Sequence, residues 1–537
     1  RDEVRSQGEK LTDVLGRLEP PGASDGLELT GAPLGKFRET LARTFDQEFG
    51  GFGSAPKFPH PTTIDRLLRH WRDTANGPEP DIDALYMATL TLTRMADGGL
   101  YDHVGGGFCR YSVDRYWQIP HFEKMLYDNG PLLALYAQAF LATGDGDFGR
   151  TATATAEWML ADMRSDDGSF FATRDADSEG EEGRYYVWTP DQVRDLLDDT
   201  DYPAFAARFG LEDAANFEGR WHLTVRESIA DIASDLNMSA ENVGAAIERG
   251  KRKLLEARGE RVPPGRDEKQ LTSWNALAVR GLVIAGRALE RSDFIDAAAA
   301  AVNFIRDKLV VDGRLLANFK DGEARFPAYL DDHAFLLDAL LELLQARWSG
   351  EHLQFAISLA DALLEHFEDE DGGGFYFTAN DHEALIHRPK PLADESVPSG
   401  NGIAAFALQR LGFLLGETRY LDAAERALRA AWQAMDEYPH GHVSLLTALE
   451  EFLEHTEIIV IRGASAEIDR WSAAAARLYA PRRLVYAIPA GETGLPGALA
   501  DRASRDDETV AYRCLGTHCE LPVTSWEALA ANLSAQR

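Results

Sequence analysis

The chain has 537 residues, 88 of them acidic and 55 basic, and a formal net charge of −33. Such a strongly negative surface argues against nucleic acid as a partner. Only ten of the basic residues are Lys, and this acidic, Lys-poor composition is typical of proteins from a salt-rich cytoplasm, where salt screens carboxylate repulsion. The alternative is an acidic patch for a cationic partner, but the charge is spread along the whole chain.

Apolar residues make up 45% of the chain, enough for a large core without metal or disulfide support. No run of eighteen apolar residues is present, so we expect no membrane span. The chain starts with Arg1 inside a polar helical pattern that reaches Leu18. We therefore expect residues 1–33 to be a helical linker from a preceding domain, in a protein without a signal peptide.

Three cysteines predict a reducing, cytoplasmic location. Cys109 is expected to be a buried thiol. Cys514, Cys519 and the nearby His518 are too few ligands for a closed zinc site, and the spacing of the cysteines is not that of a thioredoxin-type redox pair. We therefore expect Cys514 and Cys519 to be a structural pair. Phosphate-loop, dinucleotide and metalloprotease motifs do not occur, so we expect neither a metal nor a cofactor.

Amphipathic helical patterns dominate the chain and come in pairs. They cover about 62–76, 83–97, 130–143, 148–164, 271–290, 293–310, 331–346, 351–368, 400–416 and 420–437. Gly-rich aromatic segments separate the pairs, mostly 50 to 65 residues apart, at 50–53, 105–108, 167–171, 312–315 and 372–377. This repeat predicts a mainly α fold, an (α/α)6 six-hairpin barrel over 34–455, with an open solenoid as the alternative.

Two regions depart from the repeat. Residues 178–268 form a charged, helix-rich insertion that we expect to cover the barrel mouth. From residue 456 to 537 the pattern changes to strands at 457–461, 483–488 and 509–513 with a helix at 466–479. This pattern predicts a small C-terminal α/β unit.

A barrel of hairpins gathers its loops at one end, where polar side chains face a common pocket. The densest group of such residues lies between Tyr101 and Asp128, where acids and imidazoles alternate with aromatic rings, as suits a sugar. If a helix begins near Pro120, His121 and Asp128 share one of its faces. The alternative is a set of structural caps. The candidates in this segment are His103, Arg110, Tyr111, Trp117, His121, Glu123, Lys124 and Asp128.

Later candidates stand in three short motifs. In an extended loop Asp175 and Asp177 point the same way, so they are either a pair of acids for acid–base catalysis or part of a solvated acidic loop. The segment also resembles a calcium-binding loop, but Tyr186 stands where such a loop needs Glu. The adjacent carboxylates Asp331 and Asp332 lie at the start of a helix. They either cap its N-terminus or favour the protonated form of the neighbouring His333, which would suit a general acid. Candidate substrate-binding residues are Trp274, Asn275, Asp332 and Asn401.

Several long motifs resemble one family. They are the segments 51–59, 103–108, 120–129, 175–180, 274–275, 398–401 and 514–523. They are similar to the thioredoxin-domain-containing family of spermatogenesis-associated protein 20 and the bacterial YyaL-type proteins. The resemblance implies a barrel like that of N-acylglucosamine 2-epimerases and six-hairpin glycosidases, and a thioredoxin-like domain upstream. Cys109 stands where the family usually has His, which weakens a role for that position.

Together these patterns favour a cofactor-free sugar isomerase or epimerase. In this hypothesis His121 and His333 move protons and Arg110 holds a sugar oxygen, while Glu123, Asp175 and Asp177 orient the substrate. The first alternative is a glycoside hydrolase that uses two of the carboxylates as acid and base. The second is a non-catalytic module that binds clients of the thioredoxin-like domain.

Overall fold

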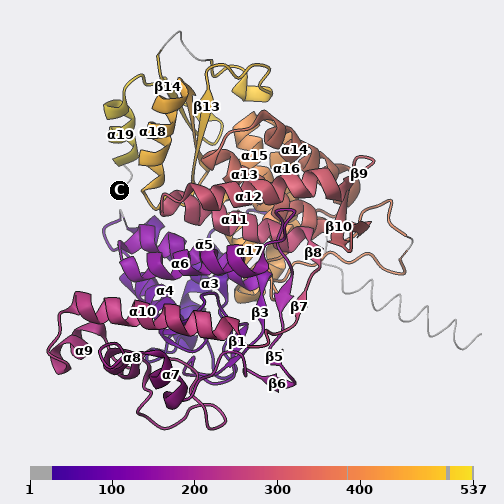
Figure 1. Ribbon diagram of the computed structural model, residues 1–537. Helices are drawn as coiled ribbons and strands as arrows, with labels where there is room; N and C mark the ends of the chain where they lie inside the picture. The colour runs from indigo at the N-terminus through magenta and orange to yellow at the C-terminus, as the bar shows by residue number, and fades with distance from the viewer. Residues whose placement is uncertain (1–26, 76, 384, 504–507, 535–537) are drawn as a thin grey trace, which may run out of the picture.

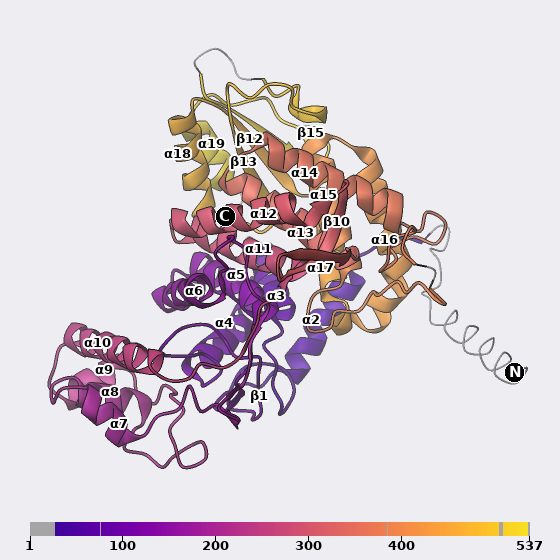
Figure 2. The same cartoon turned by 45° about the vertical axis from the view of Figure 1, so that its right-hand side comes forward.

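The computed structural model describes residues 27–534, except 76, 384 and 504–507. The helix expected over 1–18 therefore lies outside the described residues. Twelve helices of the described chain pair into six hairpins around one axis (Figures 1 and 2). Within the described residues, no helix has the length and apolarity that crossing a membrane requires.

Six of these helices form the inner wall of the barrel. They are α3 (Pro61–Thr74), α5 (Leu126–Thr143), α11 (Thr272–Ala288), α13 (Leu330–Ala346), α15 (Gly400–Leu415) and α17 (Val443–Leu453). Each contacts the next, and α17 contacts α3, so the ring closes. The predicted (α/α)6 toroid is confirmed, and the open solenoid is excluded by this closure.

The outer wall covers the inner ring. It consists of α2 (Ala32–Thr44), α4 (Ile82–Asp97), α6 (Gly146–Trp158), α12 (Ser292–Phe304), α14 (Gly350–Ala362) and α16 (Thr418–Glu437). Three outer helices end in a π-helical turn, at Met159–Met163, Ile305–Leu309 and Leu363–Phe367.

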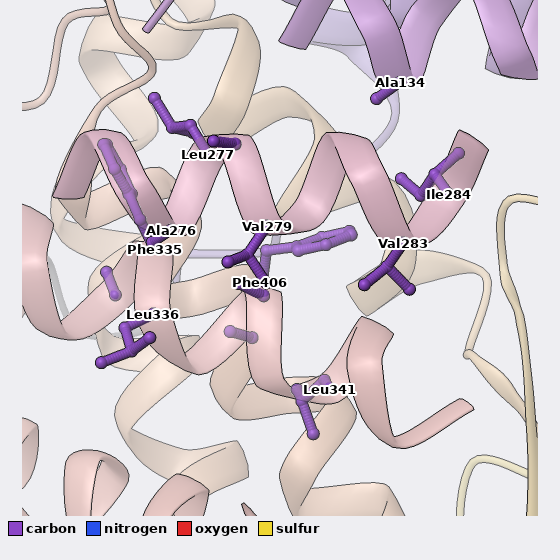
Figure 3. Packing of buried hydrophobic residues seen from close by; sticks show 14 of the residues in the cluster. Ala134, Ala276, Leu277, Val279, Val283, Ile284, Phe335, Leu336, Leu341 and Phe406 are labelled. Carbon is purple, nitrogen blue, oxygen red and sulfur yellow. The ribbon is translucent and has the colours of Figure 1, made fainter. Parts of the chain in front are cut away.

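Close packing of α5 on α11 explains the glycines of these inner helices. A Cβ at Gly281 would lie 2.3 Å from the Gly130 carbonyl oxygen, so only glycine permits this approach. Beside this contact, apolar side chains of adjacent inner helices interdigitate, among them Val279 of α11 and Phe335 of α13 (Figure 3). An inner helix is buried on nearly every face, which is why α13 has little amphipathic character.

One hydrogen-bonded device recurs where a Gly-aromatic loop meets the next inner helix. The Asn129 side chain accepts from the backbone N–H of Phe108 and donates to its carbonyl oxygen. Asn275 makes the same pair of bonds with Phe170, and Asn401 with Phe375. The amides of Asn129 and Asn275 also donate to the carbonyl just before their helices, and that of Asn401 donates to the Pro391 carbonyl in the preceding loop. The three buried asparagines therefore fix the loops to the ring.

A buried lysine closes three of the Gly-aromatic loops of the barrel. Lys124 Nζ donates to Asp102 Oδ2 and to the Gly106 carbonyl oxygen, both at 2.8 Å. Lys57 makes the same contacts with Asp46 and Gly50, and Lys390 with Asp369 and Gly373. In each case the glycine follows the aspartate by four residues, so the sequence repeat is also a repeat of side-chain chemistry.

The insertion folds beside the barrel. Its helices are α7 (Pro190–Leu196), α8 (Tyr202–Phe209), α9 (Ile229–Asp235) and α10 (Ala240–Gly259), and they pack around an apolar cluster of their own. Arg258 of α10 binds Asp102 and so ties the insertion to a barrel loop. The hairpin of β5 (Asp177–Ser178) and β6 (Glu181–Glu182) approaches the mouth, where Glu182 binds His121.

The predicted C-terminal α/β unit is present. Its sheet has the order β13-β12-β14-β15, with β12 (Glu457–Gly463) parallel to β13 (Arg483–Pro489) and antiparallel to β14 (Val510–Leu515). The edge strand is β15 (His518–Cys519), and α18 (Ser465–Ala476) and α19 (Trp526–Ser534) complete the unit. The Pro481 carbonyl oxygen accepts hydrogen bonds from Arg69 and Arg410, so this unit closes the base of the barrel.

Candidate active site

The loop end of the barrel holds a cavity of about 230 Å³. Its wall combines apolar rings with polar groups: Phe58, Pro59, His60, Pro61, Thr62, Arg110, Tyr127, Asp128, Pro131, Glu395, Ser396, Val397 and Pro398. Pro61, Thr62, Pro131 and Pro398 also line the deeper lumen, so the mouth leads into the barrel axis. A cavity of this size and composition suits a small polar molecule with apolar faces.

Asp128 is the most perturbed group at the mouth. It lies in the first turn of α5 with 8% of its surface exposed, and its Oδ2 has no hydrogen-bond partner among the described residues. Burial raises the pKa of Asp128 well above its ordinary value, and Glu123 adds to this effect against the opposing charge of Arg110. The raised pKa favours the protonated form of Asp128, which has a proton to donate.

Arg110 and Tyr127 stand beside this acid. The Arg110 guanidinium lies 3.4 Å from Glu123 Oε2 and interacts with the Tyr127 hydroxyl, which also meets Ser396. The Tyr127 ring packs edge-on against Trp274 at 4.8 Å between centroids. These contacts fix a cation, a hydroxyl and an aromatic surface around Asp128. Of this group, Tyr127 and Ser396 were not predicted, although Tyr127 directly precedes Asp128 in the sequence.

His121 lies just behind this wall. Its Nδ1 is 2.8 Å from Glu182 Oε1, and its Nε2 is 3.7 Å from Glu123 Oε2. Its ring contacts Tyr111, which stacks on Phe58 of the cavity wall. His121 thus connects to the cavity through neighbours on both sides, and 30% of its side chain is exposed.

The backbone of this segment differs from the prediction. Short strands β2 (Pro120–His121) and β3 (Lys124–Met125) replace the helix expected from Pro120, and α5 begins only at Leu126. The prediction of one shared helical face for His121 and Asp128 is therefore wrong. Backbone pairing of β2 with β1 (Tyr111–Ser112) and of β3 with β4 (Thr173–Arg174) holds this segment extended.

Two adjacent carboxylates open α13, as predicted, but they differ in their contacts. Asp332 accepts from the backbone N–H groups of Tyr329 and Ser273, so it caps α13 and ties it to α11. Asp331 is half-buried near Glu395 of the mouth. Burial, with the nearby carboxylates Asp332 and Glu395, raises the pKa of Asp331 to about 7. Burial also raises the pKa of Asp332, to about 6, against the hydrogen bonds that it accepts from Tyr329 and Ser273. Asp331 was not among the site residues predicted from the sequence.

His333 does not have the protonation state that the sequence predicted. Its Nδ1 lies 2.9 Å from the Tyr329 carbonyl oxygen, and its ring packs against Phe367. Burial lowers the pKa of His333 to about 4, and the hydrogen bond with the Tyr329 carbonyl oxygen opposes this shift only in part. The side chain is neutral at neutral pH, and it is absent from the wall of the mouth cavity.

The remaining predicted residues lie away from the cavity wall. His103 is buried, contacts the Gly98 carbonyl oxygen and packs against Phe209 of the insertion, and burial lowers its pKa to about 3. Trp117 is fully buried and donates to the Phe49 carbonyl oxygen. Asp175 and Asp177 are exposed. Lys124, Asn275 and Asn401 belong to the repeated loop contacts described above.

Below the mouth, a second cavity of about 90 Å³ follows the barrel axis. Asp338 lies on its wall, 2.8 Å from Arg280 Nε, and burial raises the pKa of this carboxyl. Asp65 and Arg69 of α3 line the same space. The sequence analysis did not select these inner-helix residues, because no motif marks a single polar residue such as Asp338 within an apolar helix. Among the described residues, no group of three or more His, Cys, Asp or Glu is arranged to hold a metal ion.

Known structures share this toroid. D-Mannose isomerase superposes with a TM-score of 0.51 at 11% identity, covering 79% of this chain and 96% of that chain. A cellobiose 2-epimerase from Bacillus thermoamylovorans also aligns, with a TM-score of 0.47 at 12% identity over 76% of this chain and 88% of that chain. The likeness to D-mannose isomerase extends to the fold alone.

Sequence comparison adds the family. No family model matches the chain. It is 33% identical to spermatogenesis-associated protein 20 of Rattus norvegicus over 468 residues, which are 79% of this chain and 58% of the rat protein. It is 31% identical to the Homo sapiens protein of the same name over 531 residues, or 90% of this chain and 67% of the human one. The chain thus belongs to the spermatogenesis-associated protein 20 family.

Proposed function

We propose that the barrel is a sugar-active enzyme that transfers protons at the carbon next to a sugar carbonyl, as an isomerase or epimerase does. The observation that carries this proposal is the buried carboxyl of Asp128, whose pKa is raised, next to Arg110 and Tyr127 in a cavity with apolar and polar walls. Proton transfer to a carbonyl oxygen requires a positioned donor of this kind. The D-mannose isomerase likeness is consistent with the proposal but supplies only the fold.

In the proposed reaction, the open-chain sugar lies in the mouth with its carbonyl oxygen toward Asp128 and Arg110. Asp128 donates a proton to that oxygen while a base removes the proton from the adjacent carbon, which gives an enediol. Arg110 stabilises the negative charge that develops on the oxygen. His121, held by Glu182 and 30% exposed, is the base, whereas His333 has no part because its side chain is buried and packed against Phe367. Phe58 and Tyr127 offer aromatic faces for the apolar side of the sugar.

The test is solvent deuterium exchange. The full chain is incubated in D2O at high salt with a panel of aldoses, ketoses, amino sugars and uronic acids, and 1H NMR follows the proton on the carbon next to the carbonyl. We expect that signal to disappear for at least one sugar. In Asp128→Asn the rate should fall by about 10²–10⁴-fold, the usual contribution of a positioned proton donor.

The amide introduced by Asp128→Asn has the shape and charge of a neutral carboxylic acid, so the fold should be retained. Asp177→Asn is the matched control, because Asp177 is exposed on β5 and should leave the rate unchanged. Exchange at the wild-type rate in Asp128→Asn would refute the assignment of the proton donor.

A second candidate function is glycoside hydrolysis, favoured by one observation. Asp331, on α13, is a second carboxyl with a raised pKa, and its neighbour Glu395 lines the mouth that Asp128 also lines. A carboxyl with a raised pKa suits a general acid, and a second carboxyl on another wall suits a base or nucleophile. Release of reducing ends from oligosaccharides, without deuterium exchange in free sugars, would favour this reaction over isomerisation.

A further inference from the structure

The three cysteines have very different surroundings. Cys109 is buried and unpaired, whereas Cys514 and Cys519 form a disulfide between β14 and the edge strand β15. Cys514 is 1% exposed, and Cys519 is exposed to solvent. One cysteine of the pair therefore lies at the surface, and the other is buried in the C-terminal unit.

The buried sulfur has a cationic neighbour. Arg502 NH2 lies 3.4 Å from Cys514 Sγ, and the Arg502 side chain is itself 6% exposed. Its NH1 finds no acceptor among the residues that the structure describes. A buried guanidinium directed at a sulfur stabilises the thiolate of that cysteine, since an adjacent cation lowers the pKa of a thiol.

Stabilisation of the chain is a weak explanation for this disulfide. The bond closes a loop of only a few residues, and such short loops gain the least from a cross-link. Cys514 and Cys519 are also direct partners in the β14–β15 pairing, so backbone hydrogen bonds already hold the hairpin together. A purely structural role, which the sequence spacing favours, also leaves the position of Arg502 without a purpose.

We propose that the Cys514–Cys519 pair is a thiol–disulfide exchange site for an external dithiol. A thiolate of the dithiol attacks the Cys519 sulfur, the Cys514–Cys519 bond breaks, and its electron pair leaves on Cys514 Sγ beside Arg502. The second thiol of the dithiol then attacks the mixed disulfide and releases Cys519. The dithiol is oxidised to a disulfide, and the two cysteines take up two electrons and two protons. The reverse reaction oxidises the pair again.

The first experiment measures the rate of reduction. The full chain is purified without reductant and mixed with dithiothreitol. Samples are quenched with acid and alkylated, and mass spectrometry gives the reduced fraction of the Cys514 and Cys519 peptides over time. In Arg502→Met we expect reduction to slow by about five- to tenfold, because a leaving thiol with a higher pKa departs more slowly. Arg470→Met removes an exposed cation from the same unit and should not change the rate.

A second measurement covers the case in which Arg502→Met fails to fold. In Cys519→Ser, absorbance at 240 nm follows the Cys514 thiolate between pH 5 and 10. Burial raises the pKa of Cys109 to about 12, so that thiol stays silent in this range. We expect Cys514 to ionise below about 8.5, the ordinary value for cysteine. Ionisation at or above that value, equal reduction rates with and without Arg502, or alkylation of both cysteines before any reductant is added would each overturn the proposal.

Discussion

Asp102 offers a direct test of how burial sets the strength of the repeated Asp–Lys contacts. Its carboxylate is 5% exposed and accepts from Lys124 Nζ at 2.8 Å and from Arg258 NH1 at 2.9 Å. Asp102→Asn leaves two buried cations without an anion. Removal of one partner from a buried ion pair costs about 3–5 kcal/mol of unfolding free energy. We expect a loss of this size, and a loosened contact between the insertion and the barrel.

The chain contains a matched control for this variant. Asp369 binds Lys390 at 2.7 Å in the same loop geometry, but its side chain is 18% exposed and it has no arginine partner in the described contacts. Asp369→Asn should therefore cost only about 1 kcal/mol, as more exposed pairs do. Urea unfolding at fixed high salt, followed by tryptophan fluorescence, compares the two variants. Equal costs would refute the argument that burial decides the strength of the contact.

The stability that Asp102 contributes should depend on pH. Burial alone would raise the pKa of Asp102, but Arg258 and Lys124 hold it well below its usual range. The stabilisation is therefore complete above the unfolded-state pKa of about 3.9 and is lost as the pH falls below that value. The stability difference between wild type and Asp102→Asn should shrink in acid. A difference that stays constant from pH 7 to pH 3 would contradict this assignment.

Three further predictions concern the ring and the mouth. Asn275→Ala should lower the unfolding free energy by about 2–3 kcal/mol, since it leaves backbone groups of Phe170 unpaired; wild-type stability in urea would contradict the loop-fixing role. Gly281→Ala should cost about 1–3 kcal/mol by overpacking α5, whereas Gly244→Ala, with open space at its Cβ, should cost nothing; similar melting temperatures would show that α11 can shift. Burial raises the pKa of Asp331 to about 7, so ionisation of this carboxyl destabilises the folded chain fully above pH 7 and not at all below about pH 4. Asp331→Asn should therefore stabilise the chain by about 1–2 kcal/mol at pH 8 and not at pH 4. Equal gains in unfolding free energy at both pH values would refute the raised pKa.

Periodic information in the sequence was enough to predict the fold. Apolar residues at helical spacing marked both helices of most hairpins, and the Gly-aromatic segments marked the loops between them. The C-terminal strands followed from continuous apolar runs such as Ile458–Ile461. These patterns are local and recur in each hairpin, so each hairpin supports the same prediction independently.

The candidate site depended on contacts that no local pattern records. His121 and Asp128 are close in sequence, yet backbone pairing keeps the first in a strand and places the second in a helix. Burial lowers the pKa of His333, against its expected protonated form, and raises the pKa of both Asp331 and Asp332. Asn275 and Asn401 looked like binding residues because polar groups in loops often bind ligands, whereas the structure uses their amides for the backbone.

Sequence by itself therefore determined the helical toroid, its C-terminal unit and the end of the barrel where the polar loops gather, because these follow from periodicity and turn chemistry. Only the tertiary structure decided which polar groups at that end are buried, paired or open to a ligand. The free energy of a carboxylate or an imidazole depends on solvent exclusion and on charges from distant segments, as the approach of Arg258 to Asp102 across 156 positions shows.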